Sequence, residues 1–192
     1  MILFINTCVR SDSRTRRLAE RVISKLAGDG AGDSTAEVEQ VVEVRTGEMV
    51  FPKVDEAFLT KRDQMKADGD FDDPVFDVAR QFASADKIVI AAPYWDLSFP
   101  ASLKQYIEQI NLNGVTFEYT PEGQLHGLCK ASELVYVTTA GGDFCPDEYG
   151  FGYIKALAQN YYGIPVVRKV QACGLDLVGA DPEAILESVE IE

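Results

Sequence analysis

The sequence predicts an α/β protein with a central sheet of five parallel strands in the order 2-1-3-4-5, covered by helices on both faces. Short apolar runs alternate along the chain with segments of helical periodicity, which is the pattern of successive βαβ units. No GxGxxG motif follows the first strand, which favours this order over that of a dinucleotide-binding domain. The 192 residues, of which 46% are hydrophobic, suit a single domain over 1–192. We therefore expect a three-layer sandwich.

Three of the expected strands lie in the first half of the chain. The apolar run 2–6 predicts a buried strand, and apolar residues at helical spacing then predict a helix that ends near Gly28. The alternating stretch 36–44 predicts a second strand, and the run 87–92 predicts a third. Two helices separated by an acidic turn are expected before this third strand, over 55–67 and 74–84.

The second half supplies the remaining strands and three more helices. Two strands are expected, over 133–140 and 165–173. Three helices are expected: one with an apolar face of Leu103, Tyr106, Ile107 and Ile110, one marked by Ile154, Leu157, Ala158 and Tyr161, and a closing one over 181–190 capped by Asp181. Segment 113–128, rich in β-prone and turn residues, predicts a hairpin outside the sheet.

Composition excludes several classes of function. The formal net charge of −13 disfavours nonspecific binding to nucleic acid and to anionic membranes. No apolar run approaches the ~20 residues of a membrane span, and the opening MILFIN is too short for a signal peptide. The four cysteines form no CxxC pair and there is one histidine, so no metal site is expected. We expect a cytoplasmic protein with reduced thiols.

The loop after the first strand carries the features of an anion site. Segment 6–17 holds Ser11, Ser13 and Thr15 at the start of a helix, where unpaired amides and the helix dipole favour an anion. Five arginines reverse the acidic balance here: Arg10, Arg14, Arg16, Arg17 and Arg21. Phosphate binding is one interpretation; simple helix capping by Ser13, with arginines on a solvated face, is the other.

Two further loops should meet the first one, because ligands of open α/β sheets bind beyond the carboxyl ends of the strands. The loop PYWDLSF begins at Pro93 and offers Tyr94 and Trp95 as flat faces for an aromatic ring. The loop TTAGGDF follows the fourth strand, and its Gly141 and Gly142 permit close approach of backbone to a ligand. An anion site, an aromatic loop and a glycine loop together suit a phosphorylated aromatic cofactor such as FMN.

The sequence resembles the FMN-dependent NADH-azoreductases, which are also described as flavodoxin-like NAD(P)H quinone reductases. The resemblance spans nearly the whole chain and is strongest in PYWDLSFPASLKQYIEQINLNGVTFEYTPEGQLHGL. Members of that family carry P-M-Y-N-F-x-x-P-x-x-L-K, a helix, and then G-x-T-F-x-Y-x-x-x-G-x-x-G-L. TTAGG is similar to the family's glycine-ended flavin loop.

The resemblance implies a flavodoxin-like fold, FMN as cofactor, and a homodimer with the flavin and segment 114–128 near the interface. It places Ser13, Arg14 and Thr15 on the phosphate-binding stretch. Together with the loop residues above, the expected cofactor-binding set is Cys8, Arg10, Ser11, Ser13, Arg14, Thr15, Pro93, Tyr94, Trp95, Asp96, Leu97, Thr139, Ala140, Gly141 and Gly142. No catalytic side chain is expected, because the flavin carries the chemistry.

Three positions depart from the family pattern. Cys8 stands where serine is usual, and Ser11 could supply the hydroxyl instead. Trp95 replaces a tyrosine and keeps a stacking face. Asp96 replaces an asparagine, and its carboxylate accepts hydrogen bonds but donates none. The substitution puts the flavin potential and the choice of substrate in doubt.

The resemblance implies ping-pong kinetics: hydride passes from NADH or NADPH to FMN, and then two electrons reduce a quinone, an azo compound or a nitroaromatic. Two other functions fit the same fold. One is an electron carrier, since the acidic charge suits basic redox partners. The other is a binding protein that has lost the cofactor. The physiological acceptor, the choice between NADH and NADPH, and any role of His126 or Cys8 are left open by the sequence.

Overall fold

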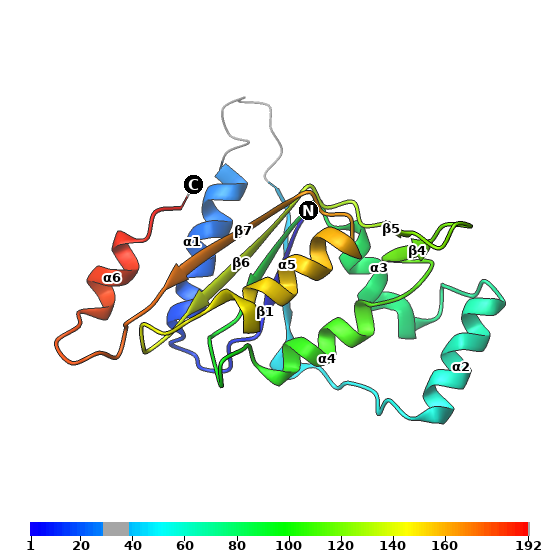
Figure 1. Ribbon diagram of the computed structural model, residues 1–192, viewed down its shortest axis with the longest axis horizontal. Helices are drawn as coiled ribbons and strands as arrows, with labels where there is room; N and C mark the ends of the chain where they lie inside the picture. The colour runs from blue at the N-terminus through cyan, green and yellow to red at the C-terminus, as the bar shows by residue number, and fades with distance from the viewer. Residues whose placement is uncertain (29–38, 192) are drawn as a thin grey trace.

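The computed structural model describes residues 1–28 and 39–191 (Figure 1). Its main sheet has five parallel strands in the order β2-β1-β3-β6-β7, which confirms the predicted order 2-1-3-4-5. The strands are β1 Ile2–Asn6, β2 Val41–Arg45, β3 Lys87–Ala91, β6 Glu133–Thr139 and β7 Val166–Ala172. The second strand was expected over 36–44, of which 36–38 lie outside the described residues, and it begins at Val41.

One face of the sheet is covered by α1 (Arg14–Gly28) and α6 (Pro182–Ser188). Side chains alternate between faces along a strand, so Ile2 and Phe4 of β1 point to this side. They pack with the buried stripe of α1, which recurs at helical spacing: Leu18, Ala19, Val22, Ile23 and Leu26. The predicted cap of the closing helix is confirmed, because the Asp181 carboxylate accepts hydrogen bonds from the N–H groups of Glu183 and Ala184.

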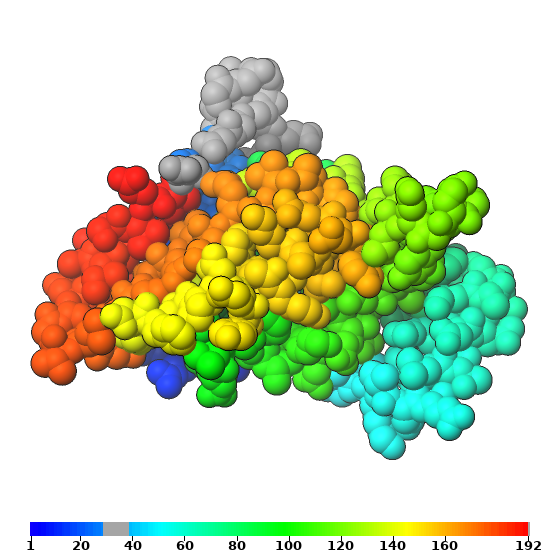
Figure 2. All heavy atoms as spheres, viewed as in Figure 1, coloured from blue at the N-terminus to red at the C-terminus, as the bar shows by residue number. Residues whose placement is uncertain are grey.

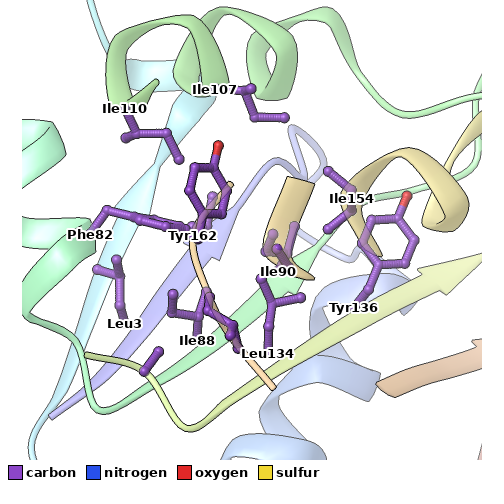
Figure 3. Close-up of a cluster of buried hydrophobic side chains, with 14 of the residues drawn as sticks. Leu3, Phe82, Ile88, Ile90, Ile107, Ile110, Leu134, Tyr136, Ile154 and Tyr162 are labelled. Carbon is purple, nitrogen blue, oxygen red and sulfur yellow. The ribbon is translucent and has the colours of Figure 1, made fainter. Parts of the chain in front are cut away.

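The other face is covered by α3 (Asp77–Ser84), α4 (Ala101–Ile110) and α5 (Phe151–Asn160). Figure 3 shows this half of the core, where Leu3, Ile88 and Leu134 of three neighbouring strands meet side chains of the helices. Every residue of the expected apolar face of α4 is buried here: Leu103, Tyr106, Ile107 and Ile110. The helix expected over 74–84 begins instead as a 3₁₀ turn, η2 (Pro74–Phe76), after which α3 follows.

Two elements extend from one end of this sandwich (Figures 1 and 2). The predicted hairpin consists of the antiparallel strands β4 (Phe117–Tyr119) and β5 (Leu125–Gly127). The helix α2 (Glu56–Ala67) is capped by Asp55 and has no buried residue. Two further 3₁₀ turns, η1 (Thr46–Glu48) and η3 (Asp147–Tyr149), lie in loops after β2 and β6. In the part of the chain that is described, no helix is both long and apolar enough to cross a membrane.

Candidate functional site

A cavity of about 350 Å³ lies at the carboxyl edge of the sheet. It is bordered by the segments that follow β1, β3, β6 and β7. The lining residues are Val9, Arg10, Asp12, Ser13, Arg14, Thr15, Pro93, Tyr94, Trp95, Thr139, Ala140, Gly141, Leu175 and Asp176. The three loops expected to meet therefore do so, at the edge where open α/β sheets bind ligands.

The start of α1 offers hydrogen-bond donors to this cavity. The Ser13 hydroxyl accepts from the N–H of Arg16 at 3.3 Å, so it caps the helix as the simpler interpretation proposed. The backbone N–H groups of Arg14 and Thr15 form no hydrogen bond with any described residue. The buried Thr15 hydroxyl lies 2.6 Å from that of Thr139, which ties the helix start to the end of β6. Free amides at a helix start that is fixed to the sheet in this way can bind an anion.

The structure separates the five arginines of this region into two groups. Arg16 pairs with Glu20 at 2.9 Å, and Arg17 pairs with Glu183 of α6. Arg21 donates to the carbonyls of Leu186 and Val189 at the end of α6. Arg17 and Arg21 join α1 to α6, Arg16 pairs within α1, and none of the three borders the cavity. Two arginines remain to meet an anionic ligand: Arg10 and Arg14.

Carboxylates balance this pair of arginines. Arg14 donates to Asp176 at 2.7 Å, and both side chains border the cavity together with Asp12. Gly141 makes room for this ion pair, because a Cβ atom there would lie 2.4 Å from the Asp176 carboxylate. The N–H of Asp176 also donates to the carbonyl of Gly141 at 2.9 Å. The glycine loop and the segment after β7 therefore form one wall.

The loop after β3 forms the aromatic part of the site. Trp95 and Ser98 exchange two backbone hydrogen bonds, of 2.9 and 2.7 Å, around a two-residue turn. Asp96 and Leu97 in this turn have φ angles of 50° and 66°. Asp and Asn tolerate this left-handed conformation better than most residues, which gives a backbone reason for either at position 96. The Ser98 hydroxyl donates to the Tyr149 carbonyl at 2.6 Å and anchors the turn.

Ten of the fifteen expected cofactor-binding residues border the cavity, and five do not: Cys8, Ser11, Asp96, Leu97 and Gly142. The side chains of Asp96 and Leu97 are exposed. Burial raises the pKa of the Cys8 thiol and outweighs the opposing effect of the nearby Arg16, so this thiol is not activated. His126 is an exposed residue of β5 in the hairpin and does not border the cavity.

Four lining residues were missed by the sequence analysis: Val9, Asp12, Leu175 and Asp176. Leu175 and Asp176 follow β7, the fifth parallel strand, so its loop reaches the same edge as the other three. That topological rule could have identified them. The four loops combine free amides, two arginines, a tyrosine and a tryptophan, and the cavity has the size of an organic ligand site. This donor set fits a molecule with an anionic group and a flat ring.

Fold and cavity define a class of doubly wound α/β proteins that bind a ligand at the carboxyl edge of the sheet. A family model described as "Flavodoxin-like fold" matches residues 1–191. The chain belongs to this flavodoxin-like family, and the resemblance drawn from the motifs is confirmed.

Relatives of this chain carry a common name. It is 31% identical over 195 residues to an FMN-dependent NADH:quinone oxidoreductase of Clostridium perfringens, covering 97% of this chain and 92% of the relative. It is 43% identical over 122 residues to FMN-dependent NADH:quinone oxidoreductase 2 of Clostridium acetobutylicum, covering 61% of this chain and 60% of the relative. The match thus spans about three fifths of the second relative's length.

A solved structure supports the fold. It is an FMN-dependent NADH-azoreductase of Bacillus anthracis in complex with FMN, with a TM-score of 0.76 and 22% sequence identity. The alignment covers 97% of this chain and 92% of that one. At this identity the likeness establishes the fold alone.

Proposed function

We propose that the protein is an FMN-dependent NAD(P)H oxidoreductase that reduces quinones, azo compounds or nitroaromatics. The observation that carries the proposal is the cavity, which unites a helix start bearing Arg10 and Arg14 with an aromatic loop and a glycine loop. The names of the clostridial relatives support the cofactor, the donor NADH and the quinone. The name of the structural neighbour supports the azo compound.

The residues at the cavity fit FMN. Arg10, Arg14 and the free N–H groups of Arg14 and Thr15 would hold the phosphate, since amides at a helix start and guanidinium groups both bind phosphate well. Tyr94, Trp95 and the backbone from Thr139 to Gly141 would hold the ring. When bound, FMN would supply the two-electron hydride chemistry that no side chain of the protein offers.

The protein's own contribution is position and electrostatics. The N–H of Gly141 makes no hydrogen bond with a described residue, so it can donate to negative charge on the edge of a bound ring. Asp176 holds the Arg14 guanidinium at the cavity wall. Trp95, with 39% of its surface exposed, offers an open aromatic face to a second flat molecule. An open face of this kind selects acceptors by flatness more than by hydrogen bonding.

The test is flavin binding followed by turnover. The purified protein is mixed with an excess of FMN, separated from free flavin, and assayed for NADH oxidation with menadione as acceptor. We expect a yellow protein. It should consume NADH only when an electron acceptor, either menadione or oxygen, is present. A colourless protein that retains no FMN would contradict the proposal. A flavin-loaded protein that does not oxidise NADH or NADPH would favour an electron carrier.

Two arginine variants test the phosphate site. Arg10→Ala should weaken FMN binding, because Arg10 borders the cavity and has no ion pair with any described residue. Arg17→Ala removes an equal charge from the same helix region, but Arg17 pairs with Glu183 away from the cavity. We expect the FMN dissociation constant to rise about tenfold for Arg10→Ala, or ~1.4 kcal/mol, and to change little for Arg17→Ala. Equal effects would remove the argument for a local phosphate site.

We also propose that the protein is a cytoplasmic homodimer. The four cysteines are all free thiols, which supports a reducing compartment. The exposed helix α2 and the exposed Tyr119 of the hairpin support a dimer, because a second copy would cover both. Cell fractionation tests the location, and an accumulation in an oxidising compartment would contradict it.

A further inference from the structure

Two of the four cysteines lie together beside the cavity. Cys173 follows β7 directly, and Cys145 lies in the loop after β6. The Cys145 and Cys173 side chains lie close enough for the Cys173 thiol to raise the pKa of the Cys145 thiol. The backbone supports this approach, since the N–H of Gly174 donates to the carbonyl of Gly142 at 2.8 Å.

The register of the sheet explains why the two cysteines are neighbours. Lys169, Gln171 and Cys173 alternate along β7 and its end, so their side chains lie on one face. The loop after β6 folds back over this face, and Cys145 borders a small cavity together with Lys169 and Gln171. The amide nitrogen of Gln171 in turn donates to the Cys173 sulfur at 2.6 Å. Gln171 therefore links the two cysteines: it donates to the Cys173 sulfur and borders the same small cavity as Cys145.

We propose that Cys145 and Cys173 form an oxidisable dithiol site that hydrogen peroxide converts into a disulfide. Cys173 attacks one peroxide oxygen, so an S–O bond forms, the O–O bond breaks and one water leaves. The Cys145 sulfur then attacks the sulfenic sulfur of Cys173, so the S–S bond forms, the S–O bond breaks and a second water leaves with the Cys145 proton. Two thiols lose two electrons and two protons, and one peroxide becomes two waters.

The assignment of the second step to Cys145 follows from its surroundings. Burial, and then the neighbouring Cys173, raise the pKa of the Cys145 thiol, so this thiol is the weaker nucleophile toward peroxide and the first attack is assigned to Cys173. The remaining cysteines have backbone partners instead. The Cys8 thiol faces the carbonyl of Ala91 at 4.0 Å, and the Cys129 thiol donates to the carbonyl of Thr116 at 3.6 Å. The thiol partners of Cys8 and Cys129 are therefore backbone carbonyls, and neither cysteine is expected to take part in the disulfide.

The bond would connect two walls of the site. The loop that carries Cys145 also carries Gly141, and the segment that begins at Cys173 also carries Asp176. In the reduced protein, backbone hydrogen bonds join these walls, including that from the N–H of Asp176 to the carbonyl of Gly141. Oxidation would add a covalent link between them, next to Tyr94, which borders both cavities.

Peptide mapping tests the proposal directly, because trypsin places each cysteine on a different peptide. Cys145 lies on 131–155 and Cys173 on 170–192, whereas Cys8 lies on 1–10 and Cys129 on 105–130. The protein is treated with stoichiometric peroxide, denatured with an alkylating agent and digested. We expect free thiols to fall from four to two per chain, with 131–155 linked to 170–192 and a loss of two hydrogen atoms in mass. Four remaining thiols, or any other linked pair, would overturn the proposal.

Variants assign the two steps. In Cys145→Ser, peroxide with dimedone should label Cys173, since the resolving thiol is missing. In Cys173→Ser, Cys145 should stay unlabelled, and the matched control Cys129→Ser should form the disulfide as the unaltered chain does. Labelling of Cys145 instead of Cys173 would overturn the order of steps. If a variant does not fold, the mapping of the unaltered protein still decides whether the disulfide forms.

Discussion

Gly141 and Gly142 are neighbours in the sequence, but their surroundings differ. A Cβ atom at Gly141 would lie 2.4 Å from the Asp176 carboxylate, whereas at Gly142 it would meet nothing within 4 Å. Gly141→Ala should therefore displace Asp176 from Arg14 and place a methyl group at the cavity wall. We expect the FMN dissociation constant to rise about tenfold, or ~1.4 kcal/mol, as measured by quenching of flavin fluorescence.

Gly142→Ala is the matched control, and its FMN affinity should stay within a factor of two of the unaltered protein. The sequence expectation placed both glycines at the cofactor, and only Gly141 borders the cavity. Equal weakening by both substitutions would mean that the ligand lies outside this cavity. An unchanged affinity in Gly141→Ala would mean that the ring does not approach this wall.

Asp86 is a second residue whose role depends on distant partners. The Lys130 ammonium, and then the Met1 amino group, lie 2.5 Å from its carboxylate and lower its pKa from 3.8 to about 2. A carboxyl whose pKa is lower in the folded state stabilises the fold above pH 3.8, and the contribution is lost as pH falls toward 2. Asp86→Asn should therefore unfold at lower urea concentration at pH 7, and the difference should vanish between pH 4 and pH 2.

Glu122→Gln is the control for this titration, because Glu122 is exposed in the hairpin and forms no ion pair with a described residue. Its urea midpoint should follow that of the unaltered protein throughout the range. The side chain of Asp86 is 39% exposed, so added salt should reduce the effect of Asp86→Asn as well. A difference that persists at pH 2 would show that the asparagine acts by packing and not by charge.

Residue types alone indicate part of this candidate site, whereas pairing between distant residues shapes the rest. Hydroxyls and arginines near a helix start indicated an anion site, and Ser13, Thr15, Arg10 and Arg14 do border the cavity. Arg17 instead pairs with Glu183, a residue from a distant segment, and so lies away from the cavity. No local pattern reveals such pairing, and the same holds for Asp176, which lies 162 positions from Arg14.

At the scale of elements, the hairpin is attached to the body by a backbone contact. A Cβ atom at Gly127 of β5 would lie 2.2 Å from backbone atoms of Tyr162 and Gly163. Phe117 of β4 also packs on Tyr161, with ring centroids 5.0 Å apart. Gly127→Ala cannot be relieved by a side-chain rotation, so the hairpin must separate from the end of α5. We expect a loss of about 2–3 kcal/mol in the free energy of unfolding, measured with urea.

Gly123→Ala in the hairpin turn separates packing from backbone strain. Gly123 has a φ of +78°, but its Cβ would meet nothing within 4 Å. This variant should lose only ~1 kcal/mol, the cost of the left-handed conformation. If Gly127→Ala is no worse than Gly123→Ala, the hairpin does not dock on the segment 162–163 in solution.

Elements were predictable where burial is reflected in the sequence, as helical spacing for a helix buried on one face and as a continuous apolar run for a strand buried on both faces. The buried face of α4 is of the first kind, and β1, β3 and β6 are of the second. The start of α3 was less predictable, since Asp73 accepts a hydrogen bond from the N–H of Val75 and forms a 3₁₀ turn first. The left-handed turn at Asp96 and Leu97 was missed because neither residue is a glycine.

At the scale of the whole molecule, the strand order could be predicted because alternating strands and helices allow few topologies. The order then brought four loops to one edge, and three of them were named from the sequence. The shape of the cavity could not be predicted, since it depends on bonds between loops such as Thr15 to Thr139. Apolar surfaces that are exposed in a single chain raise a further question, namely whether two copies of the chain associate.

The helix α2 is the clearest such surface. It has no buried residue, and most helices in proteins depend on packing of an apolar face for their stability. Leu59 of α2 and Tyr119 of the hairpin are large apolar side chains with 38% and 52% of their surface exposed. Both lie at the same end of the molecule (Figure 1). In α2 only Met65 packs on a buried hydrophobic cluster of the described residues, so a second copy on this end would bury both side chains and add to the packing of α2.

Sedimentation equilibrium tests the dimer. We expect about 42 kDa, twice the 21.1 kDa of one chain, at micromolar concentration. Leu59→Lys and Tyr119→Lys should shift the mass toward that of one chain, because a buried unpaired ammonium opposes association. Val178→Lys is the matched control: Val178 is fully exposed and lies between β7 and α6, at the other end of the molecule (Figure 1). A dimer lost in Val178→Lys but kept in the other two would place the interface at the opposite end, and a single-chain mass for the unaltered protein would exclude the dimer.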